Sequence, residues 1–136
     1  MLALLALTCA TTAISQPTDS NLLANPGMET ADDGLPAFWE ARTPTDVDRL
    51  MEWVATSPHS GERCLKITNH SETKSRWRAG HDRDIRLKPG SEATLTGWVR
   101  HEGGGAGYLR FYFLGVKGGV IAQPSSAQIT GDSKWT

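Results

Sequence analysis

Excess positive charge, helical periodicity and cysteine are all lacking in this sequence of 136 residues. Because 14 Lys and Arg residues face 15 Asp and Glu residues, the net charge is −1, and no overall basic field exists to hold a nucleic acid. No window of about twelve residues repeats apolar positions at helical spacing without a Gly or Pro. The 14 Gly and 7 Pro residues likewise argue against a coiled coil, a helical bundle or a membrane protein.

Charge is also absent from residues 1–15, where an apolar run at 2–7 is followed by small residues at 8–13. This pattern is typical of the hydrophobic and cleavage parts of a secretory signal peptide, here without the usual positive start. We predict cleavage before Gln16, a linker at 16–20, and a secreted, periplasmic or cell-surface location. The alternative, a membrane anchor, is disfavoured because the apolar run is short.

Cysteine is limited to Cys9 and Cys64, and cleavage of the signal would leave Cys64 alone. An exported domain with one thiol has no internal disulfide, so its stability must come from its core or from a metal. At the other end, residues 134–136 read as the opening of a strand after a turn at 131–133. We therefore expect part of a longer protein with further covalently linked domains, its domain at 21–136 cut before the last strand or strands.

What the sequence does contain is a series of short strand signals separated by clusters of turn-forming residues. The strand signals lie at 50–56, 64–69, 84–87, 92–100, 108–116 and 128–130, and the turn clusters lie at 57–61, 88–90, 103–107 and 117–119. Spacing of this kind favours an all-β fold, an antiparallel β-sandwich.

Two of these strands can be read face by face, because side chains alternate along a strand. In 92–100 the core side carries Leu95, Gly97 and Val99, and in 108–116 it carries Leu109, Phe111 and Phe113. The glycine-rich loop at 103–107 is expected to join the two strands as a hairpin. Its second face then combines aromatic and basic side chains, namely Trp98, Arg100, Arg110 and Tyr112.

The segment that follows the predicted linker resembles the opening of a known family. Residues 21–29 read N-L-L-A-N-P-G-M-E and residues 33–39 read D-G-L-P-A-F-W. They are similar to the opening of carbohydrate-binding modules of families four and nine, in which an N-P-G-F-E stretch precedes D-G-x-P-x-x-W. Further similar segments follow in order at 60–67, 85–90, 93–100, 109–113 and 133–136. The resemblance covers about residues 21–136 and implies a galactose-binding-like jelly roll appended to a glycoside hydrolase or another polysaccharide-active protein.

The resemblance also implies a structural calcium ion, with the carboxylate of Glu29 as one ligand. In such modules a second carboxylate comes from the last strand, which this chain does not reach. Met28 stands where the family has Phe, a mild change at a core position.

Tryptophan is unusually common, with 5 Trp against 3 Phe and 2 Tyr. Flat aromatic side chains stack on the C–H faces of sugar rings, and guanidinium groups present paired donors to hydroxyls or uronic acid carboxylates. The predicted carbohydrate-binding residues are Trp98, Tyr112, Arg100, Arg110 and Trp77.

Each of these residues has a simpler alternative. Trp98 and Tyr112 could pack beneath a loop, Arg100 and Arg110 could be solvated, and Trp77 could cap a sandwich edge. The remaining tryptophans, Trp39, Trp53 and Trp135, are expected to serve the sandwich itself.

Few features of the sequence indicate a catalytic site. His101 and Glu102 lack the second histidine of a zinc-protease helix, and the glycine run at 103–107 lacks the lysine of a phosphate loop. Cys64 has no histidine at a fixed offset, and the pairs Asp32–Asp33 and Asp46–Asp48 read as loop residues or calcium ligands. We predict a non-catalytic polysaccharide-binding module; the alternative is a structural or protein-interaction jelly roll of a cell-surface protein with no sugar site.

Overall fold

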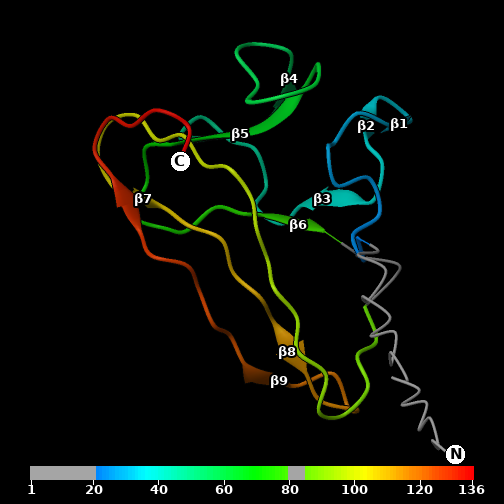
Figure 1. The fold of residues 1–136 in the computed structure, drawn as a ribbon. Coiled ribbons are helices and arrows are strands. Elements are labelled where there is room, and N and C mark those ends of the chain that lie inside the picture. The colour runs from blue at the N-terminus through cyan, green and yellow to red at the C-terminus, as the bar shows by residue number, and fades with distance from the viewer. Residues whose placement is uncertain (1–20, 80–84) are drawn as a thin grey trace, which may run out of the picture.

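The computed structural model describes residues 21–79 and 85–136, and the predicted signal peptide and linker lie outside them. Within these ranges the chain forms strands, turns and extended segments and contains no helix (Figure 1). The strands associate as antiparallel pairs. The all-β prediction is therefore confirmed, whereas the sandwich arrangement of the pairs stays a prediction.

The strands are short. They are β1 (Ala31–Asp32), β2 (Leu35–Pro36), β3 (Trp39–Ala41), β4 (Arg49–Val54), β5 (Cys64–Asn69), β6 (Trp77–Ala79), β7 (Ala106–Gly107), β8 (Phe113–Leu114), β9 (Val120–Ala122) and β10 (Ile129–Thr130). In the part of the chain described, β1 pairs with β2, β3 with β6, β4 with β5, β7 with β10 and β8 with β9.

The loop that precedes β1 is organised by Asn25. Its side-chain amide donates to the carbonyls of Thr30 at 3.0 Å and Ala37 at 2.9 Å, and its Oδ1 accepts the Thr30 N–H at 3.1 Å. Its own carbonyl accepts the indole N–H of Trp39 at 2.9 Å. Asn25 has a φ of 50°, a left-handed conformation that Asn tolerates better than most residues. Through its side chain and its backbone carbonyl, Asn25 thus ties this loop to Thr30, to Ala37 and to the start of β3.

The longest strand pair, β4 with β5, matches the strands predicted at 50–56 and 64–69. Two tryptophans attach this pair to its surroundings. The indole N–H of Trp53 donates to the Met28 carbonyl at 2.8 Å, and that of Trp77 in β6 donates to the Lys66 carbonyl at 3.3 Å. The half-buried Trp53 also lies beneath the Arg63 guanidinium, 4.2 Å from its ring centroid. The expectation that Trp53 serves the fold agrees with these contacts.

The predicted hairpin between 92–100 and 108–116 is wrong. Residues 106–114 pair instead with 120–130, through β7 with β10, a bridge between Arg110 and Ser125, and β8 with β9. These two segments run side by side from β7 to β9 in Figure 1. The strand register of this hairpin is irregular, with a shift between Phe113 and Leu114.

The reason for the different pairing lies in the two glycine-rich loops. The turn at 115–119 is closed by hydrogen bonds from the Gly115 N–H to the Gly119 carbonyl and from the Gly118 N–H to the Gly115 carbonyl, both 2.8 Å long. Gly118 has a φ of 79°, which this turn requires. A tight turn brings its flanking strands together at low entropic cost, so 108–114 pairs with the segment that follows it.

The segment 92–100 forms no strand, and its end pairs with the last residues of the chain. Val99 and Thr136 exchange two backbone hydrogen bonds of 3.0 and 3.1 Å, and the Ser133 N–H donates to the His101 carbonyl at 2.8 Å. Of the other predicted strands, 128–130 is observed as β10, whereas 85–87 is exposed and unpaired and Asp84 lies outside the described residues.

Few side chains are buried in the described part of the chain. Pro36 is fully buried, and Ala37 and Thr43 are buried at 7% and 6% exposure. In contrast, Val116 and Ile121 near the turn at 115–119 are exposed. Hydrogen bonds from side chains to loop backbone therefore carry an unusual share of the stability of this structure.

We predict that Asn25→Ala destabilises the protein by about 2–4 kcal/mol, since it removes three hydrogen bonds and places Ala in a left-handed conformation. The matched control is Asn21→Ala, which removes a single exposed hydrogen bond to the Leu23 N–H and should cost about 0.5 kcal/mol or less. Urea unfolding measures both variants. Equal costs would show that Asn25 does not organise the loop.

Candidate functional site

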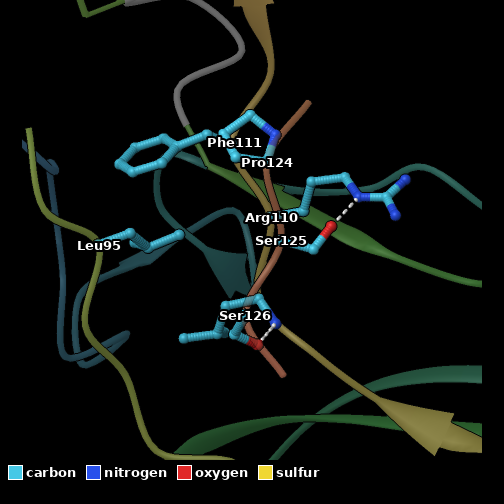
Figure 2. A pocket seen from close by; sticks show the side chains of 7 residues that line it. Leu95, Arg110, Phe111, Pro124, Ser125 and Ser126 are labelled. Carbon is cyan, nitrogen blue, oxygen red and sulfur yellow. Dashed lines mark hydrogen bonds between the residues drawn. The ribbon is translucent and has the colours of Figure 1, made fainter. Parts of the chain in front are cut away.

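The hairpin formed by 106–114 and 120–130 places aromatic and basic side chains on one of its sides. The Arg110 guanidinium lies 4.9 Å from the centroid of the Tyr108 ring. Across the hairpin, Arg110 donates from Nε to Ser125 Oγ at 2.7 Å and from Nη1 to Gln123 Oε1 at 3.3 Å. Figure 2 shows Arg110 and Phe111 pointing to opposite sides of their strand. The alternation predicted for this segment therefore holds over these residues, although its pairing partner was wrong.

The opposite side of the same strand is apolar. Phe111 and Phe113 lie with ring centroids 5.7 Å apart. A pocket of about 240 Å³ lies here, and its walls are Leu95, Leu109, Arg110, Phe111, Pro124, Ser125 and Ser126 (Figure 2). Its volume is below that of pockets that enclose a small-molecule ligand, so it is better explained as a packing gap between 92–100 and the hairpin.

Trp98 lies in a separate aromatic group, which we call the Trp98 cluster: His59, Trp98, Arg100 and Trp135. The imidazole of His59 stacks on the Trp98 indole with centroids 4.1 Å apart and planes 13° apart. Trp135 meets His59 edge-on at 5.9 Å, and the Arg100 guanidinium lies 5.6 Å from the Trp135 ring. Trp98 remains 59% exposed despite these neighbours. The cluster thus presents one flat indole to solvent and supports it from one side.

Tyr112 contacts Arg76, a residue just before β6. Arg76 donates from Nη1 to the Tyr112 hydroxyl at 3.3 Å, and its guanidinium lies 5.5 Å from the centroid of the Tyr112 ring. Tyr112 is 39% exposed. Both contacts of Tyr112 thus come from one charged side chain, that of Arg76.

The five predicted binding residues therefore divide into three places. Trp98 and Arg100 belong to the Trp98 cluster, Arg110 and Tyr112 lie on the polar side of the hairpin, and Trp77 lies in β6. Trp77 is half-buried and its indole N–H is bound by the Lys66 carbonyl, a contact that fits the edge-capping alternative. Arg100 forms an ion pair of 3.2 Å with Glu102.

Sequence reasoning missed four residues of these groups: His59, Trp135, Arg76 and Tyr108. Tyr108 could have been found, because it shares the alternation of Arg110 and Tyr112. His59 and Arg76 could not, since both reach their partners from segments far away in the sequence.

Glu29 anchors the turn that precedes β5. Its Oε1 accepts the backbone N–H groups of Glu62 at 3.1 Å and Arg63 at 3.4 Å. Its other carboxylate oxygen makes no hydrogen bond to any described residue, so it is available to a cation. No group of three or more His, Cys, Asp and Glu side chains that could hold a metal gathers in residues 21–79 and 85–136. The second carboxylate oxygen of Glu29 can supply one calcium ligand, but a calcium site needs several. Calcium binding therefore stays a prediction.

The Asp46 carboxylate and the Cys64 thiol lie in surroundings that suit a structural role. Asp46 accepts a hydrogen bond from Arg49 Nε at 2.9 Å and the Asp48 N–H at 3.0 Å, and the Arg49 side chain lowers the pKa of Asp46. Burial raises the pKa of the Cys64 thiol. Since the thiolate is the reactive form, this environment is unfavourable for a nucleophilic cysteine.

We predict that Gly61→Ala destabilises the protein more than Gly90→Ala. Both glycines have a positive φ, 69° and 81°, so both substitutions strain the backbone by about 1–2 kcal/mol. A Cβ at Gly61 would also meet Glu29 Cδ at 2.8 Å, whereas a Cβ at Gly90 meets nothing within 4 Å. Displacing the carboxylate should cost about 1 kcal/mol more.

The measurement is urea unfolding of both variants in the wild-type and Glu29→Ala backgrounds. The excess cost at Gly61 should disappear once the Glu29 carboxylate is removed. An excess that persists in that background would contradict the anchoring role of Glu29.

No helix of the described residues is long and apolar enough to cross a membrane. In comparisons with known proteins, no family model, no curated protein and no solved structure matches this chain. The resemblance to carbohydrate-binding modules therefore rests on the sequence motifs alone.

Proposed function

We propose that this protein is a non-catalytic carbohydrate-binding module of jelly-roll type, exported and linked to a polysaccharide-active enzyme. The observation that carries the proposal is Trp98, a large aromatic side chain that stays 59% exposed while it stacks on His59. Such an exposed, stacked indole offers a flat apolar face that a ligand can cover.

The chemistry of the Trp98 cluster suits a sugar. A pyranose ring presents C–H groups on its faces and hydroxyls at its edge, so it needs a flat apolar surface with polar groups beside it. His59 restricts the rotation of the indole, which lowers the entropy lost when a ligand binds. Arg100 lies against the adjacent Trp135 and has N–H groups beyond those that its ion pair with Glu102 uses.

The second candidate function is a protein-interaction or structural jelly roll with no sugar site. It is favoured by the apolar side chains around the turn at 115–119, where Ile121 is 73% exposed and Val120 is 53% exposed. Exposed apolar groups at a hairpin end are a common feature of protein contacts. This candidate makes no use of Trp98.

We predict that Trp98→Ala abolishes the retardation of the protein in native gels that contain its soluble polysaccharide. Losing one stacked aromatic ring should weaken binding at least tenfold, and Trp98→Phe should retain part of the affinity. Ile121→Ala is the matched control, because it also truncates an exposed hydrophobic side chain.

The panel should include β-glucans, xylans, mannans and uronic acid polymers. Retardation of the wild type and of Ile121→Ala but not of Trp98→Ala supports the proposal. If no glycan retards the protein, the proposal is refuted and the protein-interaction function is favoured.

Calcium binding by Glu29 is a separate part of the proposal, taken from the resemblance. We predict that EDTA lowers the melting temperature and that added calcium restores it, because an ion at 100 times its Kd stabilises the folded state by about 2.7 kcal/mol. Glu29→Gln should melt at the same temperature with and without EDTA. A wild-type melting temperature that EDTA leaves unchanged would refute calcium binding.

A further inference from the structure

Two arginines of this protein lie over tyrosines rather than beside carboxylates. Arg42, Arg49 and Arg100 form ion pairs with Glu40, Asp46 and Glu102. Arg76 and Arg110 instead lie over the rings of Tyr112 and Tyr108, and neither has a carboxylate within ion-pair distance among the described residues. Their positive charges are therefore not neutralised by the protein in the part of the chain described.

These four side chains form two contacting pairs along one extended segment, which together we call the tyrosine–arginine strip. Tyr108, Arg110 and Tyr112 occupy alternate positions of the extended segment between β7 and β8, where alternate side chains share a side and are spaced by about 6.6 Å. Arg76 extends the strip through its hydrogen bond to the Tyr112 hydroxyl. The strip is therefore longer than one sugar ring and alternates aromatic and cationic groups.

The donors of the strip are only partly used. Arg110 donates hydrogen bonds from Nε and Nη1 to the neutral acceptors Ser125 and Gln123. Its Nη2 makes no hydrogen bond within the described residues. Arg76 uses Nη1 on Tyr112. A guanidinium has five N–H groups, so both side chains retain donors for a carboxylate, with which hydrogen bonds are charge-assisted.

We infer that the tyrosine–arginine strip binds an acidic polysaccharide, with uronate carboxylates on Arg110 and Arg76 and sugar rings against Tyr108 and Tyr112. This inference rests on the proposed carbohydrate-binding function and names the class of its ligand. The charge that selects the ligand comes from two residues of the strip, while the chain as a whole has a net charge of −1. A polynucleotide, which needs an extended basic surface, fits this charge distribution less well.

The test compares polygalacturonate with its fully methyl-esterified form, which keeps the sugar backbone and removes the carboxylate charge. Polygalacturonate should retard the wild type in native gels, and the esterified polymer should bind at least tenfold more weakly. Arg110→Gln and Arg76→Gln should each weaken binding of polygalacturonate about tenfold or more, and the double variant should abolish it. Arg86→Gln is the matched control, because it removes one charge from an exposed residue outside the strip.

Circular dichroism of each variant verifies that it is folded, and Arg110→Lys provides a second variant at the same position. Lys keeps the charge but loses the planar fork, so its affinity should fall between those of wild type and Arg110→Gln. Equal affinity for both polymers, or equal loss in Arg86→Gln, would overturn the inference.

Three outcomes separate this inference from the proposed function. Binding to neutral glycans alone, lost in Trp98→Ala, would overturn the strip and keep the carbohydrate-binding function. No binding to any glycan would overturn both. Binding of single-stranded poly(dT) as tightly as polygalacturonate would show that the strip recognises polyanions in general, and would overturn selection of uronates.

Discussion

Hydrogen bonding of loop backbone by polar side chains is the constraint on which this structure depends. Because so little apolar surface is buried, unsatisfied N–H and carbonyl groups in the loops would not be offset by a large core. The amide of Asn25 meets three of these groups and the carboxylate of Glu29 meets two. Asn25 and Glu29 of the opening motif are thus explained by local backbone hydrogen bonds, whatever they do with a ligand.

The same constraint explains the excess of tryptophan over the smaller aromatics. The indole N–H groups of Trp39, Trp53 and Trp77 each bind a backbone carbonyl of another segment, so these residues fasten loops and strand pairs to one another. Trp98 and Trp135 instead pack around His59, and Trp98 is left open to solvent. Three tryptophans are therefore accounted for by the fold, and Trp98 is the one whose exposed face we propose as a ligand surface.

Local features of this chain could be predicted from sequence, and long-range ones could not. The alternation of Arg110 and Phe111 was readable because it depends on strand geometry alone. The partner of that strand was not, because glycine-rich loops precede and follow it and either could have formed the hairpin turn. The stacking of His59 on Trp98 joins a turn to a distant segment, and no periodicity marks such a contact. The candidate site was consequently predicted as one face, whereas the structure divides its residues between the Trp98 cluster, the hairpin and β6.

The central claim is that the exposed face of Trp98 receives a sugar, and tryptophan fluorescence during titration with soluble polysaccharides tests it most directly. We expect a saturable change in emission for the wild-type protein, since a sugar on the indole removes water from it, and no such change for Trp98→Phe. Trp39→Phe should keep the response, because the indole of Trp39 is bound inside the fold. An emission change that survives in Trp98→Phe, or none with any glycan, would contradict the assignment of Trp98 as the sugar-binding surface.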